Sequence, residues 1–257
     1  MKRLVALFSF TALIAGAFTA YAGMPPATGV NGSWHDITYL GQNGTTYNQD
    51  EYQRVCIFCH TPHNAMQTLQ PAPLWNHEIT QENPTPYVWA APANSGITFN
   101  ADRLIGPSRL CESCHDGSLA VDAHGGAGQQ NNGTTQMSGP RMVNDLTITH
   151  PIGFSYAQAY TLRGASQIYD VIGANTTFAT DVQLSNTAGV YNTIIRGTEK
   201  IVDHLYQSTW MTCATCHDVH NTNNAVSSPG VTTGNVPNYF VWAKEDKSLL
   251  CLSCHIK

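Results

Sequence analysis

The sequence has little charge, and it has no cysteine outside one repeated motif. Lys, Arg, Asp and Glu make up 11% of its 257 residues, against about 25% in a typical soluble domain. The formal net charge of −5 argues against a nucleic acid or an anionic membrane as the partner. After the N-terminal segment no apolar run is long enough to cross a bilayer. We therefore expect no membrane span in the mature protein.

The N-terminal segment has the order of a secretory signal peptide. A basic tripeptide precedes an apolar run at 4–18, and the small-x-small sequence Ala20-Tyr21-Ala22 follows. This order predicts cleavage after about Ala22. The alternative is a membrane anchor, but the run is short for a span of about 20 residues, and the cleavage sequence follows it directly. We expect residues 1–22 to be removed and residues 23–257 to form a single secreted domain.

All eight cysteines lie in four Cys-x-x-Cys-His motifs. The motifs are Cys56-Ile57-Phe58-Cys59-His60, Cys111-Glu112-Ser113-Cys114-His115, Cys213-Ala214-Thr215-Cys216-His217 and Cys251-Leu252-Ser253-Cys254-His255. Eight cysteines in a secreted protein could form four disulfides, and four Cys-x-x-Cys pairs could form two Cys₄ zinc sites. Neither alternative requires a histidine directly after the second cysteine, and only 11 of the 257 residues are histidine. Cys-x-x-Cys-His is the signature of covalent haem attachment.

The spacing within the motif has a chemical reason. Two thioether bonds fix the vinyl edge of the porphyrin, and the adjacent imidazole then lies under the iron as its proximal ligand. The sequence therefore predicts four haem c groups with His60, His115, His217 and His255 as proximal ligands. Four large apolar discs can replace much of a protein core, which explains how a chain rich in Gly, Asn, Thr and Ser folds.

The second axial ligand of each iron decides the function. An open position permits substrate chemistry, whereas a second strong ligand leaves only outer-sphere electron transfer. His63 and His220 each lie three positions after the histidine of the preceding motif. Neither can swing to the opposite face of the same haem, but each can reach a neighbouring one. His35 and His150 are further candidates. The remaining histidines are expected to be surface or hydrogen-bonded residues: His77, His124 and His204.

The motif sequences repeat in pairs. Residues 56–64 read CIFCHTPHN and residues 213–221 read CATCHDVHN, and each is followed by a Trp-bearing segment and a simpler motif. We interpret this as a two-haem unit used twice, with haem pairs at 56–115 and 213–255 and a long insert at 116–212. The expected fold is mostly irregular coil. Short helices should lead into the motifs near residues 50, 107, 204 and 246, with Ser108 as a possible N-cap, and residues 161–200 should form a few short strands.

Several segments together resemble a known family. They are Trp34-His35-Asp36, Cys59-His60-Thr61-Pro62-His63-Asn64, Pro73-Leu74-Trp75-Asn76, residues 110–117, His150-Pro151-Ile152-Gly153-Phe154 and residues 213–220. In combination they are similar to secreted tetrahaem c-type cytochromes with doubled Cys-x-x-Cys-His motifs, in particular the OmcE-like extracellular cytochrome nanowires of metal-respiring bacteria. The resemblance runs from about residue 30 to the end of the chain.

The resemblance implies bis-histidine haems stacked in an unbroken chain and subunits polymerised head to tail. It assigns the distal ligands to His35, His63, His150 and His220. It also implies that a distal histidine just after the first motif crosses to a haem of the next subunit; His63 occupies that position, and His35 is the alternative.

Three functions follow from these expectations. The first is extracellular electron transfer by a filament on the cell surface, from outer-membrane or periplasmic cytochromes to metal oxides or other external acceptors. Such a protein is an electron carrier and not an enzyme. The second is a discrete soluble periplasmic tetrahaem carrier, although such carriers often steer to their partners by charge, which is scarce here. The third is a multihaem reductase, which needs an open iron, whereas this sequence has spare histidines.

Overall fold

A computed structural model describes residues 30–31, 33, 35–38, 50–66, 73–125, 136–137, 142–170, 201–220, 240–241 and 249–256. The predicted signal peptide and the helix predicted near residue 246 lie outside the described residues. Among the helices that are described, none has the length and apolar character needed to cross a membrane.

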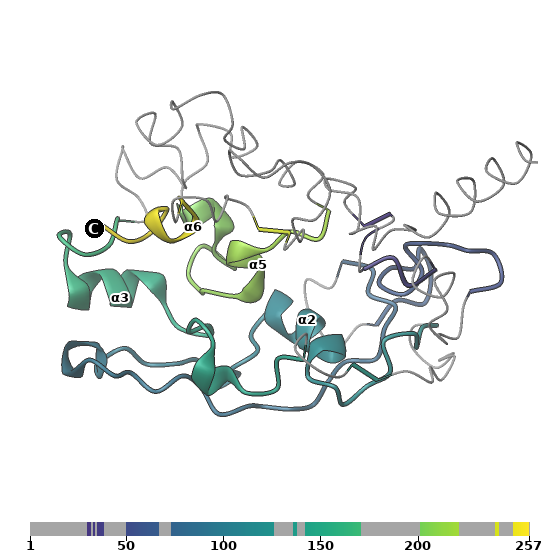
Figure 1. Ribbon diagram of the computed structural model, residues 1–257, viewed down its shortest axis with the longest axis horizontal. Coiled ribbons are helices and arrows are strands. Elements are labelled where there is room, and N and C mark those ends of the chain that lie inside the picture. The colour runs from purple at the N-terminus through teal and green to yellow at the C-terminus, as the bar shows by residue number, and fades with distance from the viewer. Residues whose placement is uncertain are drawn as a thin grey trace, which may run out of the picture.

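Short helices joined by irregular segments make up the described chain (Figure 1). The α-helices are α2 (Pro107–His115), α3 (Tyr156–Arg163), α5 (Cys213–Cys216) and α6 (Leu249–Leu252), and the 3₁₀ helices are η1 (Pro92–Asn94), η3 (Leu146–Ile148) and η4 (Ile201–His204). No described residue belongs to a strand, and pairing outside helices is limited to isolated bridges such as His60–Trp75. The prediction of a mostly irregular chain with short helices is confirmed.

The short strands predicted at 161–200 are wrong for the part that the structure describes. There α3 continues to Arg163, Gly164 caps it with a φ of 81°, and turns follow as far as residue 168. The β-branched residues that suggested strands lie mostly at 171–200, outside the described residues. The helix predicted near residue 50 is instead a series of turns, and η4 ends, rather than begins, at His204.

The helix α2 carries the second motif, and local sequence explains where it begins. Pro107 suits the first helical position because the amide hydrogen that it lacks has no helical partner there. Gly106 precedes it with a φ of 61°, so the prediction of Ser108 as the N-cap is wrong. The Ser108 hydroxyl instead accepts the backbone N–H of Cys213 at 3.0 Å. This bond ties the start of α2 to α5, which carries the third motif.

Two small hydrophobic clusters support the motifs. The larger contains Phe154, Tyr156 and Ile201, and the partly buried Cys254 of the fourth motif packs against it. The smaller contains Phe58 of the first motif, and Cys114 of the second motif packs against it. Each cluster therefore holds part of a Cys-x-x-Cys-His motif in place.

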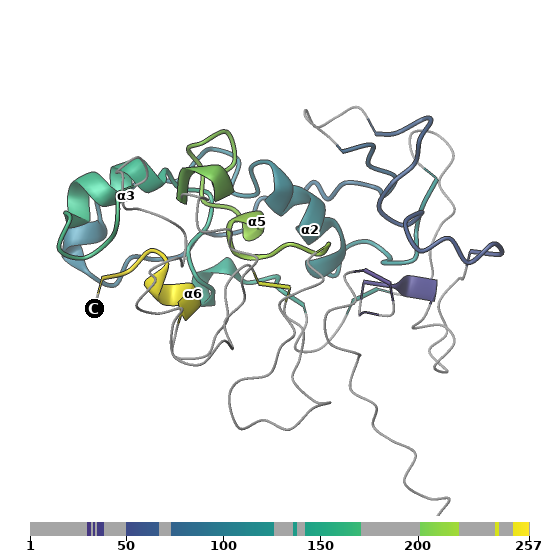
Figure 2. The same cartoon turned by 90° about the horizontal axis from the view of Figure 1, so that it is seen from above.

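The motif-bearing segments follow one another along the long axis of the molecule. In Figures 1 and 2, α3 and α6 lie at one end and α5 and α2 in the middle. The dark blue segment that includes the first motif lies toward the other end in both views. The order in space is therefore fourth, third, second and first motif.

Candidate functional site

Each motif forms one helical turn that directs its histidine and its first cysteine to the same side. In three motifs the histidine N–H donates to the carbonyl of the first cysteine four residues earlier: His60 to Cys56 at 2.7 Å, His217 to Cys213 at 3.0 Å and His255 to Cys251 at 2.9 Å. In the second motif the helix α2 provides the same turn. Residues four apart share one helix face, so the three attachment groups of each motif converge.

None of the eight cysteines forms a disulfide; Cys56 and Cys251 are exposed, and the other six are partly buried. Burial raises the pKa of the second cysteine to about 12 in every motif: Cys59, Cys114, Cys216 and Cys254. Cys111 and Cys213 are hydrogen-bonded to each other, which raises the pKa of Cys111 and lowers the pKa of Cys213. The attachment groups of the second and third motifs therefore lie side by side.

Three histidines from outside the motifs face three motif histidines. His35 and His115 have ring centroids 6.0 Å apart, His60 and His220 also 6.0 Å, and His150 and His255 6.4 Å. The ring planes meet at 48°, 23° and 71° in the same order. These three partners are among the four predicted distal ligands.

The paired rings have the spacing that a bis-histidine metal site requires. Two imidazoles bound at about 2 Å to opposite sides of one metal ion have ring centroids about 6 Å apart. A haem iron takes its other four ligands from the porphyrin, so its protein site is a pair of histidines. In the described part of the chain, no group of three or more His, Cys, Asp or Glu side chains is placed to hold a metal ion. The histidine pairs and the adjacent cysteines fit haem c.

The protein around His35 favours the neutral imidazole, which is the form that binds a metal. Burial and then the nearby His115, His217 and His220 lower the pKa of His35 to about 4. Desolvation by neighbouring atoms also lowers the pKa of His150, although the Pro151 carbonyl at 3.0 Å from its Nδ1 acts in the opposite direction.

The fourth predicted distal ligand, His63, does not join this arrangement within the chain. Its side chain is exposed, and among the described residues its ring contacts none of the four motif histidines. The remaining motif histidine, His217, lies close enough to His35 to contribute to the lowering of its pKa.

The three remaining histidines occupy other positions. His77 is fully buried, and its two ring nitrogens lie 2.7 Å from the Glu78 carbonyl and 2.8 Å from the Ala120 carbonyl. His124 is buried, with its Nδ1 3.1 Å from the Asp122 carbonyl. His204 lines a cavity of about 470 Å³ with Leu205 and with Ala214 of the third motif, among others.

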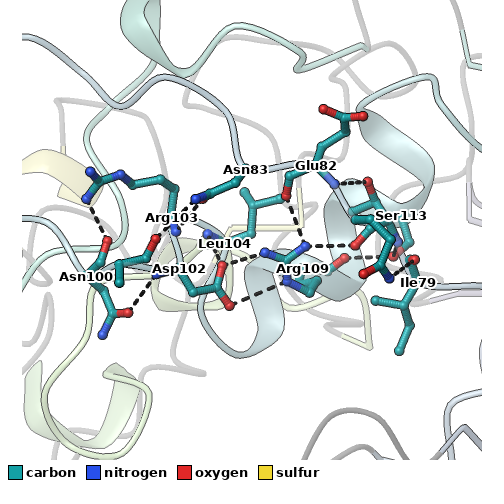
Figure 3. Close-up of polar contacts among 12 residues, drawn as sticks. Ile79, Glu82, Asn83, Asn100, Asp102, Arg103, Leu104, Arg109 and Ser113 are labelled. Atoms are coloured by element: carbon teal, nitrogen blue, oxygen red, sulfur yellow. Dashed lines mark hydrogen bonds and ion pairs between the residues drawn. The ribbon is translucent and has the colours of Figure 1, made fainter.

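A polar network around α2 was not predicted from the sequence. Figure 3 shows Arg109 at its centre, two residues before Cys111. Its guanidinium donates to the Thr80 carbonyl at 2.7 Å, to the Glu82 carbonyl at 3.0 Å and to the Asp102 carboxylate at 2.5 Å. Arg109 thereby joins α2 to two segments on its outer side. An arginine before a motif is not a recognisable signal, because only the fold brings its partners together.

Comparisons with protein-family models and with curated proteins find no match for this chain. The functional interpretation therefore depends on the residues of the chain and on their geometry.

Proposed function

We propose that the chain is a tetrahaem c-type cytochrome that transfers electrons as the repeating subunit of an extracellular filament. The observation that carries this proposal is the placement of His35, His220 and His150 opposite three motif histidines, at the spacing of a bis-histidine haem. Each pair joins a histidine of a Cys-x-x-Cys-His motif to one that is distant in sequence. When bound, haem would supply a reversible one-electron carrier at each site.

The residues at each site have defined tasks in this proposal. The eight cysteines form the thioether bonds, and His60, His115, His217 and His255 bind from the proximal side. His35, His150 and His220 bind from the distal side within the same chain. A haem held by two histidines would leave no place for a substrate to bind its iron, so it would supply outer-sphere electron transfer.

The side-by-side arrangement of two motifs supports rapid transfer between neighbouring sites. The side chains of Cys111 and Cys213 are neighbours, so the attachment edges of the two haems that they would hold are close together. Ser108 reinforces this contact through its bond to the Cys213 N–H. The succession of the four motifs along the long axis (Figure 2) is consistent with a linear path from one end of the subunit to the other.

The position of His63 supports the filament. It is exposed, and we propose that it binds a haem of the next subunit. The alternative crossing residue, His35, already faces His115 of its own chain at 6.0 Å. A contact in which one subunit donates a ligand to the next is heterologous, and it produces a filament if the rotation does not close a ring. Metal oxides or other external acceptors would receive the electrons.

The test is electron microscopy of the secreted, haem-loaded protein, with haem content measured as the pyridine haemochrome and the subunit identified by mass. We expect uniform filaments with four haems per chain, and discrete particles for His63→Ala. The matched control is Asn64→Gly, because Asn64 is the exposed neighbour of His63 and its φ of 59° suits glycine. Discrete particles of the unaltered protein with four haems would favour the periplasmic carrier, and a chain without covalent haem would overturn the proposal.

A further inference from the structure

The first and third motifs continue into turns of the same kind that differ in one charge. Thr61 and Asp218 each directly follow the motif histidine. The Thr61 hydroxyl lies 3.4 Å from the N–H of His63, and the Asp218 carboxylate accepts the N–H of His220 at 2.9 Å. Side chains of Thr and Asp both form such turns. The turn itself therefore does not require a carboxylate at residue 218.

The Asp218 carboxylate also reaches the imidazole of His220. Its Oδ1 lies 3.4 Å from His220 Nδ1, while the ring of His220 faces His60 with the two planes only 23° apart. In a neutral imidazole one nitrogen carries the proton and the other is free to bind a metal. A carboxylate beside Nδ1 favours the proton there, which leaves Nε2 as the metal-binding atom.

The other paired histidines have an uncharged acceptor or none at the same atom. The Nδ1 of His60 lies 2.6 Å from the Pro73 carbonyl, and that of His150 lies 3.0 Å from the Pro151 carbonyl. The Nδ1 of His35 is buried and has no hydrogen-bond partner among the described residues. Of these four rings, only His220 faces a charged acceptor.

We propose that Asp218 is a positioning residue that lowers the reduction potential of the haem held by His60 and His220. The inference rests on the haem function proposed above. A carboxylate that accepts the Nδ1–H makes the imidazole a stronger electron donor, and a stronger donor stabilises ferric iron over ferrous iron. The one-electron reduction of this haem is then less favourable than at the His35–His115 site, where one ring lacks such an acceptor.

The experiment is a potentiometric titration of the full, haem-loaded chain at one fixed neutral pH, with four haems first verified as pyridine haemochrome. We expect Asp218→Asn to raise the midpoint potential of one of the four haems and to leave the other three unchanged. Changes around a metal-bound histidine typically alter equilibria by about tenfold or more, which for a one-electron couple is a rise of about 59 mV.

Two further variants separate the carboxylate from the turn. Asp218→Thr reproduces the turn of the first motif without the charge and should raise the potential as Asp218→Asn does. Asp218→Glu keeps the carboxylate and should stay closer to the unaltered protein than either. Four bound haems with unchanged potentials in both Asp218→Asn and Asp218→Thr would overturn the role of Asp218 alone. A preparation of the unaltered chain that contains no haem would overturn the proposed function itself.

Discussion

His150 and His255 face each other with ring centroids 6.4 Å apart, because the segment after α3 docks onto the end of the chain. The Tyr169 N–H donates to the Cys254 carbonyl at 2.9 Å, and the Ile256 N–H donates to the Gln167 carbonyl at 2.8 Å. These two bonds hold the fourth motif against the segment that follows α3. His255 of this motif then lies opposite His150. The pairing depends on backbone contacts as well as on the two imidazoles.

Removal of His150 should open one haem site and leave the others closed. We expect His150→Ala to produce a high-spin ferric EPR signal equivalent to about one haem in four, because one iron loses its second strong ligand. The control is His124→Ala, which removes a buried histidine that faces no motif histidine. High-spin signal of equal size in both variants, or in neither, would contradict the assignment of His150.

The angles between paired rings predict different EPR signals for different sites. The relative orientation of two axial imidazoles decides which iron d orbitals receive electron density from the ligands, and therefore sets the shape of the low-spin ferric signal. The planes of His60 and His220 are close to parallel at 23°, and those of His150 and His255 are closer to perpendicular at 71°. We expect signals of both types in the oxidised protein. Loss of the parallel type in His150→Ala, rather than in His220→Ala, would contradict these orientations.

The sequence predicts which histidines belong to the candidate site but not which of them face each other. The motifs predict the proximal histidines, and local sequence together with the resemblance predicts His35, His150 and His220 as ligands, all of which the structure brings to motif histidines. Which motif histidine each one faces depends on the docking of distant segments, and no local pattern contains that information. The binding of an iron between them stays a prediction, as does the role of His63.

In the fold, too, features set by neighbouring residues could be predicted, whereas contacts between residues distant in sequence could not. The helix at Pro107 could be predicted because proline and the motif are local signals, whereas the role of Ser108 could not. Its hydroxyl accepts an N–H from Cys213, more than a hundred residues further along the chain. Arg109 and Asp102 also meet only after the intervening turn has formed (Figure 3).

Gly106 should be the least replaceable of the glycines next to helix ends. Its φ is 61°, and an added Cβ would lie 2.7 Å from the ring of Tyr206. We expect Gly106→Ala to lower the free energy of unfolding of the haem-loaded protein by about 1–3 kcal/mol, from backbone strain and steric overlap. Gly164→Ala is the control, because Gly164 has a φ of 81° but open space around it. Denaturant titration should show the smaller loss for Gly164→Ala.

The raised pKa of the buried Glu112 carboxyl predicts that the stability of the protein depends on pH. Only 2% of this residue is exposed, and burial, followed by Cys213 and Asp116, raises the pKa of its carboxyl from 4.5 to about 8. Because the folded pKa exceeds the unfolded one, its contribution to stability is fully present below the unfolded pKa. That contribution is lost as the pH rises through about 8, with a slope of up to about 1.4 kcal/mol per pH unit.

The measurement is chemical denaturation of the haem-loaded protein between about pH 5 and 8, with Glu112→Gln as the variant. We expect the unaltered chain to lose stability across this range and Glu112→Gln to lose less of it. Thioether formation removes the influence of the Cys213 thiol, but burial is the largest cause and persists. Equal slopes for the two proteins would show that Glu112 does not titrate between its unfolded and folded pKa values.

His77 should contribute to stability through both of its ring nitrogens. The two nitrogens of this buried ring lie 2.7 Å from the Glu78 carbonyl and 2.8 Å from the Ala120 carbonyl. His77→Phe would remove both contacts, at a cost of about 0.5–1.5 kcal/mol for each hydrogen bond lost. His124→Phe removes a ring with one such contact, the Asp122 carbonyl at 3.1 Å, and should cost less. We expect calorimetry to give a lower Tm for His77→Phe than for His124→Phe, and the reverse order would contradict the larger contribution of His77.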